Sequence, residues 1–103
     1  MIFLCLKGYQ ILEWRYKTRF GEIDIIARKS RVIACIEVKA RRAKVEISEV
    51  LRPHQIMRIK QAAEFFLYQN PQFRNHLLRL DFIEVGASFL PKHRKNFLCL
   101  GLS

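Results

Sequence analysis

Three charged residues, Asp24, Glu37 and Lys39, interrupt two apolar stretches of this chain and are the side chains best suited to chemistry. Asp24 lies within Glu22–Arg28, and Glu37 and Lys39 lie two positions apart within Val32–Lys39. On a strand, residues i and i+2 project from the same face, so Glu37 and Lys39 project together. An unpaired charge in an apolar strand costs free energy or shifts its pKa, so these three charges indicate a functional site.

Phosphodiester hydrolysis is the reaction that this set of residues can catalyse. Two converging carboxylates form the oxygen-rich site that Mg²⁺ or Mn²⁺ prefers. A neighbouring lysine can orient or deprotonate the attacking water and stabilise negative charge. We therefore expect Asp24 and Glu37 to be metal ligands and Lys39 to be a catalytic residue. The alternative is a solvated strand face on which the three residues form ion pairs that add little stability.

Other polar residues are weaker candidates for the same site. Gln55 stands in the first turn of an expected helix, where it could reach a phosphate or a water together with the helix N-terminus; the alternative is an exposed surface residue. Glu22 shares the face of Asp24 and is either an outer ligand or an exposed strand end. Asp81 is either a partner of the site or the partner of a nearby arginine. His54 is expected to be exposed and is not proposed as a base.

The elements that position these residues follow from hydrophobic spacing and turn residues. Pro53 suits the first turn of a helix, and apolar residues at helical spacing continue it to about Gln69, where Asn70-Pro71 ends it. Residues 41–51 have mixed charge without a period and are expected to form a loop. The predicted strands are Tyr9–Tyr16, Glu22–Arg28, Val32–Lys39, Leu78–Val85 and a short Phe97–Leu100. This order predicts an α/β fold with a mixed central sheet.

The turn at Lys29-Ser30-Arg31 predicts an antiparallel hairpin between the second and third strands. If its loop has an even number of residues, Asp24 lies on the same face as Glu37 and nearly opposite it. With an odd number it does not. The register of this hairpin therefore decides whether the two carboxylates can share a metal ion.

The charge of the chain predicts a polyanionic partner. Its formal net charge is +10 and its pI is about 10.1, which favours nucleic acid, DNA before RNA, over an anionic membrane surface. A basic protein whose charge only maintains solubility is the remaining alternative. The basic residues nevertheless occur in groups, which suits phosphate contacts. The residues predicted to contact nucleic acid are Arg19, Arg41, Arg42 and Lys44.

Size and cysteine usage limit the remaining possibilities. A chain of 103 residues, half of them hydrophobic, forms one small domain, 1–103. Cys5, Cys35 and Cys99 lack the spacing of a zinc site and are expected to be buried free thiols in the cytoplasm. The apolar segment Met1–Leu6 is too short for a membrane span or a signal peptide. It is expected to belong to the core, and no membrane association is expected.

The chain resembles the YraN-type family of uncharacterised bacterial proteins, which belongs to the restriction-endonuclease-like PD-(D/E)xK superfamily. The combination of FGEIDIIA with EVKARR is far more specific than an isolated ExK spacing. The resemblance spans most of the chain and implies a nuclease core in which Asp24 and Glu37 bind the metal and Lys39 is the catalytic lysine. It leaves the substrate open. The matching segments are Gly8–Leu12, Arg19–Ala27, Ile36–Arg42, Pro53–Gln55 and Leu80–Phe82.

The sequence departs from this family's pattern in three places. The family usually begins with a helix carrying a Glu that approaches the metal site, whereas no acidic residue precedes Glu13 here. We therefore expect this N-terminal helix to be missing or truncated, which could expose an apolar surface and favour a homodimer. Arg52, a poor N-cap, replaces the usual Thr before the helix proline. His54 replaces the usual Lys before Gln55.

The resulting expectation is a metal-dependent, endonuclease-like protein that binds nucleic acid and hydrolyses phosphodiester bonds. The alternative is a non-catalytic nucleic-acid-binding module that keeps the nuclease fold but has a weakened site. A basic interaction protein or membrane-surface protein is the third possibility. No helix rich in Arg, Asn and Gln is evident, so sequence-specific readout of DNA is not expected.

Overall fold

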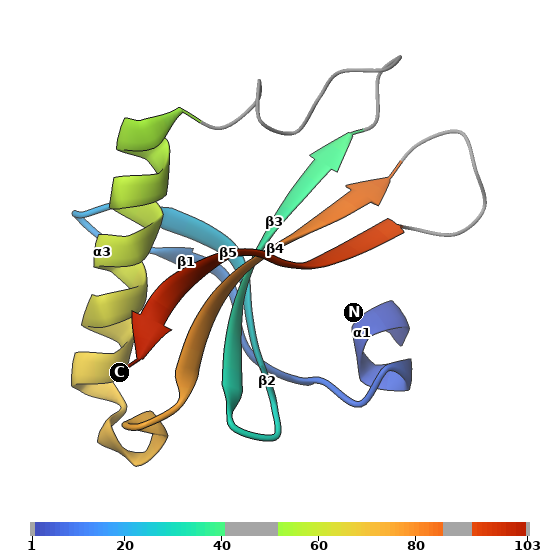
Figure 1. The fold of residues 1–103 in the computed structure, drawn as a ribbon, viewed down its shortest axis with the longest axis horizontal. Helices are drawn as coiled ribbons and strands as arrows, with labels where there is room; N and C mark the ends of the chain where they lie inside the picture. The colour runs from blue at the N-terminus through green and yellow to red at the C-terminus, as the bar shows by residue number, and fades with distance from the viewer. Residues whose placement is uncertain (1, 41–51, 86–91, 103) are drawn as a thin grey trace.

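The computed structural model describes residues 2–40, 52–85 and 92–102 (Figure 1). The predicted strands and the long helix are all present, and the last strand is longer than Phe97–Leu100. Residues 41–51, predicted to be a loop, lie outside the described residues. The elements in chain order are α1 (Ile2–Leu6), β1 (Gln10–Lys17), β2 (Glu22–Lys29), β3 (Val32–Ala40), α3 (Pro53–Gln69), the 3₁₀ helix η1 (Pro71–Phe73), β4 (Leu77–Val85) and β5 (Lys92–Leu102).

One five-stranded sheet has the order β1-β2-β3-β4-β5. The pair β3·β4 is parallel and the other neighbouring pairs are antiparallel. Parallel neighbours need a crossover connection, and α3 lies in the one between β3 and β4. This arrangement confirms the mixed α/β sheet with an antiparallel hairpin that the sequence predicted.

The β2–β3 hairpin has the register that brings the two carboxylates together. Its ladder runs from the pair Lys29 and Val32 to the pair Ile25 and Ile36, which leaves a two-residue loop. Ser30, in that loop, has a φ of 54°, a left-handed conformation common in tight hairpin turns. Because the loop has an even number of residues, Asp24 lies opposite Glu37, at the position that follows the last ladder pair, Ile25 and Ile36.

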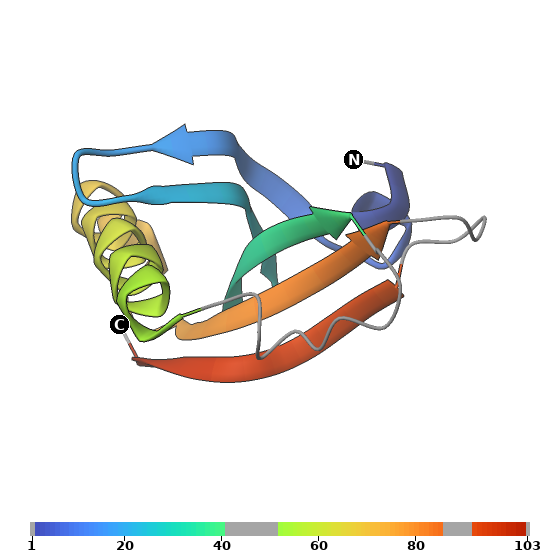
Figure 2. The ribbon, with the colours of Figure 1, turned by 90° about the horizontal axis from the view of Figure 1, so that it is seen from above.

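The two faces of the sheet carry separate cores. Helix α3 lies on the side of one core and α1 on the side of the other (Figures 1 and 2). On one face, α3 buries Ile59, Ala62, Ala63 and Phe66 against side chains of β2, β3 and β4. On the other face, Leu4 of α1 packs with β2, β3 and β4 side chains. The apolar N-terminus therefore contributes to the core, as predicted.

At the N-terminus, where the sequence predicted a helix that is missing or truncated, the structure has a helix of five residues, α1. Leu4 is fully buried, but Cys5 beside it is exposed, so the prediction of buried thiols was wrong for Cys5 and correct for Cys35. Successive helical residues point about 100° apart, so a single turn can bury Leu4 and leave its neighbour in solvent. The side chain of Cys99 is outside the described part of the structure.

The connection between β1 and β2 lies against α3, where the β1–β2 end curls over the helix (Figure 2). The Thr18 hydroxyl accepts hydrogen bonds from the backbone N–H groups of Phe20 and Gly21, at 3.0 and 3.1 Å, and so closes the turn. The Arg58 Nε donates to the Phe20 carbonyl at 3.2 Å. A Cβ on Gly21 would lie 2.7 Å from the Arg58 carbonyl oxygen, so only glycine permits this approach.

Candidate active site

A pocket of about 200 Å³ opens between the hairpin and the first half of α3. It contains all four residues that the sequence predicted to be catalytic. Because the hairpin loop has an even number of residues, Asp24, Glu37 and Lys39 all lie on the face of the sheet that α3 covers. Gln55 reaches the pocket from the first turn of α3. The lining residues are Glu22, Asp24, Glu37, Lys39, Gln55, Arg58 and Ile59.

The half-buried Asp24 carboxylate lies where the β2–β3 ladder stops. Its Oδ2 accepts a hydrogen bond from the Val38 backbone N–H at 2.9 Å. The side chain thereby replaces a backbone acceptor at a point where the strands separate. This bond fixes the carboxylate beside Glu37 and leaves its other oxygen for a further contact.

Glu37 is the most perturbed carboxyl group of the site. Burial, then the charge of Asp24 and a hydrogen bond with the Asp24 side chain, raise its pKa to about 7, although the Asp24 backbone and Lys39 favour the ionised form. Its Oε1 is buried without a hydrogen-bond partner. Such an orphaned acceptor is costly in a folded protein and is typical of a position that a cation or an ordered water completes.

Lys39 is half-buried and lies on the same strand face as Glu37. Among the described ion pairs, none joins Lys39 to Asp24 or Glu37. The alternative of a cross-strand ion pair on an exposed face therefore does not describe this site, because Glu37 is largely buried and faces Asp24 instead.

Gln55 lines the pocket and also caps α3. Its Oε1 accepts a hydrogen bond from the Arg52 backbone N–H at 2.9 Å, which is one half of a capping box. Arg52 has no side-chain acceptor and cannot supply the other half. Gln55 is exposed, as one of its two interpretations expected, and this bond does not use its amide nitrogen.

The donor set fits a divalent cation only in part. Asp24 and Glu37 line the same pocket and offer carboxylate oxygens, the ligands that Mg²⁺ and Mn²⁺ prefer. One of these oxygens, Glu37 Oε1, is buried and has no hydrogen-bond partner. Glu22 lines the same pocket but is exposed at the strand end. Within the described ranges, no three His, Cys, Asp or Glu side chains gather closely enough to hold a metal by themselves. Water and substrate would have to complete the coordination.

Arg58 is a pocket residue that the sequence analysis did not single out. It lies three positions after Gln55 on α3, a spacing that places two side chains on one helix face, so helical periodicity could have identified it. Of the predicted nucleic-acid contacts, Arg19 is exposed in the connection between β1 and β2, and its guanidinium lies 5.0 Å from the Phe20 ring centroid. Arg41, Arg42 and Lys44 lie outside the described residues. His54 is exposed, as expected.

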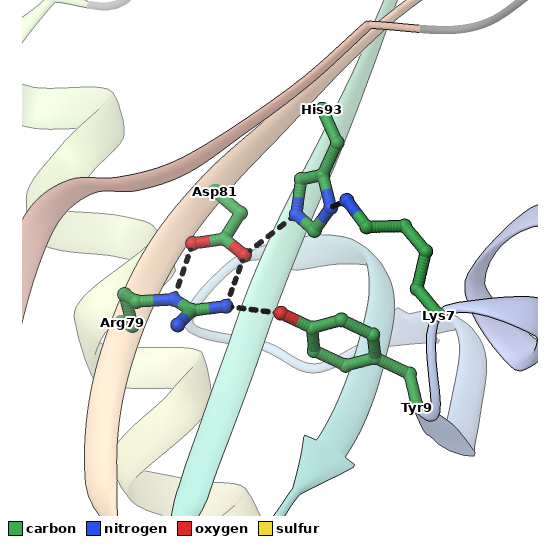
Figure 3. Close-up of polar contacts among 5 residues, drawn as sticks. All are labelled: Lys7, Tyr9, Arg79, Asp81 and His93. Carbon is green, nitrogen blue, oxygen red and sulfur yellow. Dashed lines mark hydrogen bonds and ion pairs between the residues drawn. The ribbon is translucent and has the colours of Figure 1, made fainter.

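Asp81 belongs to a second polar group on the opposite face of the sheet (Figure 3). It is fully buried, and its carboxylate binds Arg79 through two 2.7 Å contacts and the His93 Nε2 at 2.8 Å. Arg79 also donates to the Tyr9 hydroxyl, and Lys7 contacts the His93 Nδ1. The interpretation of Asp81 as an arginine partner is confirmed, and the network joins the N-terminal segment to β4 and β5.

Comparisons with known proteins show to which family this chain belongs. The model of the uncharacterised protein family UPF0102 matches residues 1–85. The chain belongs to the UPF0102 family. This confirms the YraN-type resemblance, because UPF0102 is that family.

Individual relatives agree with this assignment. A UPF0102 protein of Rhodopseudomonas palustris (strain BisB5) is 45% identical over 91 residues, which cover 88% of this chain and 70% of the relative. A UPF0102 protein of Agrobacterium fabrum is 44% identical over 92 residues, 89% of this chain and 75% of the relative. A third UPF0102 protein, from Sinorhizobium medicae, is 43% identical over 90 residues, which cover 87% of this chain and 74% of the relative.

The UPF0102 match extends over α1 to β4 and thus includes every described residue of the pocket. No helix in the described part of the chain is long and apolar enough to cross a membrane.

Proposed function

We propose that this UPF0102 protein is a metal-dependent, endonuclease-like enzyme that binds DNA and hydrolyses its phosphodiester bonds. One observation carries the proposal: Glu37 has a buried, unpartnered carboxylate oxygen in a pocket that it shares with Asp24, Lys39 and Gln55. A structural ion pair would not leave this oxygen without a partner. Mg²⁺ or Mn²⁺, held by Asp24 and Glu37, would neutralise charge on the phosphate and lower the pKa of bound water.

The side chains of the pocket have distinct roles in this proposal. Asp24 and Glu37 bind through carboxylate oxygens, and the Val38 N–H keeps Asp24 in place. Lys39 donates hydrogen bonds that orient the attacking water and stabilise negative charge on the phosphate. The Gln55 amide nitrogen and the Arg58 guanidinium donate to phosphate oxygens at the mouth of the pocket.

Charge supports DNA as the proposed substrate. The net charge of +10 attracts a polyanion, and Arg19, Arg58 and Lys39 bring positive charge to the pocket and the adjoining turn. Arg41 and Arg42 follow directly after β3, so they continue the positive charge in sequence beyond Lys39. The proposed setting is the cytoplasm, where the thiols of Cys5 and Cys35 remain reduced.

A non-catalytic nucleic-acid-binding module is the second candidate. The observation in its favour is that the described residues place only two carboxylates, Asp24 and Glu37, at the buried end of the pocket, with Glu22 exposed. A protein of this kind would bind DNA without cutting it. Hydrolysis by the purified chain therefore separates the two candidates.

The test is a cleavage assay with Mg²⁺ or Mn²⁺ on duplex, single-stranded and branched DNA. Glu37→Ala and Lys39→Ala should each reduce cleavage about 100-fold or more, while DNA binding largely survives. Lys60→Ala removes an exposed cation of α3 that does not line the pocket, so it is the matched control and should cut like the wild type. Cleavage that survives either pocket substitution would refute the assignment, and binding without any cleavage would favour the second candidate.

A further inference from the structure

We infer that a groove beside the pocket, lined by Phe20, Gln61, Glu64 and Phe65, binds an unpaired base of a DNA strand whose backbone lies at the Asp24–Glu37 site. This inference rests on the proposed function and specifies its substrate as DNA with unpaired bases. The groove measures about 310 Å³, at the small end of the range of ligand sites, which suits a group as small as one base.

Two aromatic rings line this groove. The Phe20 and Phe65 ring centroids are 5.6 Å apart with an interplanar angle of 53°, and both side chains are only half-buried. Rings this close and this tilted cannot enclose a base between them, but they offer an apolar surface on which one base can stack. Stacking on exposed aromatic side chains is how proteins bind single strands without reading their sequence.

Polar groups and charges of both signs lie beside these two rings. Arg19 lies over the Phe20 ring at 5.0 Å, so its charge stands beside the groove, where a phosphate of the same strand would lie. Gln61 and Glu64, both exposed, offer amide and carboxylate groups to the edge of a stacked base. A purely apolar partner would leave these polar groups unused, whereas a nucleotide uses both the rings and the charge.

Arg58 connects the groove to the proposed catalytic pocket. It lines the pocket, and its Nε donates to the carbonyl of Phe20, whose ring lines the groove. Arg58 and Phe65 are seven residues apart on α3, about 10 Å along the helix axis. A stacked strand advances about 3.4 Å per nucleotide, so the bound base would lie within a few nucleotides of the phosphate at Asp24 and Glu37.

The test is a binding measurement in EDTA, so that it does not depend on metal or cleavage. A fluorescently labelled single-stranded oligonucleotide, its duplex, and the same strand with abasic sites are titrated with the full chain at low salt. Single-stranded DNA should bind the wild type more tightly than the abasic strand does. Phe65→Ala should weaken single-strand binding at least about fivefold and change duplex binding less than twofold.

Two further variants keep this test decisive. Phe65→Leu preserves most of the apolar volume and should remain folded. Like Phe65→Ala, it should weaken the binding of single-stranded DNA, because it removes the aromatic ring. Tyr68→Ala removes an aromatic ring of α3 that is 82% exposed and lines neither cavity, so it should leave binding unchanged.

Equal binding of normal and abasic strands, or unchanged binding by both Phe65 variants, would overturn the inference. Cleavage of duplex DNA in the separate assay would then still support the proposed function. Phe65-dependent binding without any cleavage would support the groove and overturn the catalytic proposal, so the two failures are distinguishable.

Discussion

The Asp24 carboxylate accepts a hydrogen bond from the Val38 backbone N–H, with 2.9 Å between Oδ2 and the nitrogen, just beyond the last ladder pair of β2 and β3. One side chain therefore both holds β3 in place and supplies a proposed metal ligand. These two roles make different demands on the residue, because an amide can accept the hydrogen bond but is a poor ligand for Mg²⁺.

Substitution of Asp24 should separate its two roles. Asp24→Asn keeps an acceptor for the Val38 N–H and should remain nearly as stable as the wild type while losing cleavage. Asp24→Ala leaves that N–H without a partner and should lower the free energy of unfolding by about 1 kcal/mol relative to Asp24→Asn. Urea denaturation measures the difference, and hydrogen exchange should show faster exchange of the Val38 amide in Asp24→Ala alone. Equal exchange in both variants would contradict the bond.

The raised pKa of Glu37 predicts a stability that depends on pH. Its folded-state pKa of about 7 lies above the ordinary value of 4.5, so the folded protein binds this proton more tightly than the unfolded chain does. The protonated Glu37 side chain therefore contributes to folding stability below about pH 4.5, and this contribution is lost as the pH rises through about 7. Glu37→Gln keeps a neutral side chain and should therefore stabilise the protein above pH 7 by about 1–3 kcal/mol, with little effect near pH 4.5.

Denaturant unfolding at pH 5 and pH 8 measures this effect. Glu64→Gln, on the exposed side of α3, is the matched control and should change stability by a similar small amount at both values. A Glu37→Gln protein that is less stable than the wild type at pH 8 would show that the ionised carboxylate has a partner that stabilises it.

Mn²⁺ should stabilise the wild type against heat, because only the folded protein brings Asp24 and Glu37 together. At a concentration of 100 times its dissociation constant, a ligand adds about 2.7 kcal/mol, or several degrees in Tm for a domain of this size. The shift should be larger at pH 8 than at pH 5.5, since the metal requires ionised Glu37. It should vanish in Asp24→Asn and Glu37→Gln and persist in Glu64→Gln. A shift that survives in both pocket variants would place the metal elsewhere.

Local patterns allowed most of the fold to be predicted from the sequence. The apolar stretches Glu22–Arg28 and Val32–Lys39, the tight turn between them, and Pro53 at a helix start are all local signals that depend on neighbouring residues. They were sufficient for the hairpin and α3. The sequence left the register of the hairpin open, because the number of residues in its loop decides whether Asp24 and Glu37 share a face, and the structure shows a two-residue loop.

Contacts between distant segments were not predictable in this way. Gly21 looks like an ordinary turn residue until α3 is placed against it. The interaction of His93 with Asp81 depends on the pairing of β5 with β4, which periodicity does not specify. The burial that raises the pKa of Glu37 likewise arises only when the sheet and helix are assembled.

Gly21→Ala should displace α3 from the turn between β1 and β2. The new Cβ would lie 2.7 Å from the Arg58 carbonyl oxygen, which is backbone and cannot rotate away, so the cost should be about 1–3 kcal/mol. Hydrogen exchange should show weaker protection of α3 around Arg58, and cleavage should fall with it. Gly8→Ala is the matched control: a φ of 90° strains alanine there, yet its Cβ would meet only the Lys29 side chain, at 3.4 Å and beyond. Unchanged α3 protection in Gly21→Ala would contradict the close approach.

Asp81→Asn should destabilise the fold while leaving the catalytic pocket intact. The carboxylate is fully buried between Arg79 and His93, and removing its charge leaves the Arg79 cation, whose side chain is 13% exposed, without its counter-ion. Loss of one member of a buried ion pair costs about 3–5 kcal/mol. Because Asp81 lies on the α1 face of the sheet and the pocket on the α3 face, the folded variant should retain the Mn²⁺-induced shift in Tm and any cleavage at low temperature.

Lys7→Met tests the same network from its outer end and should cost less, since Lys7 is only half-buried. Hydrogen exchange in both variants should increase first in the N-terminal segment that Lys7 and Tyr9 connect to β4 and β5. Loss of the metal-induced shift in a folded Asp81→Asn protein would instead make Asp81 a partner of the catalytic site acting through the sheet, the alternative that its burial on the opposite face argues against.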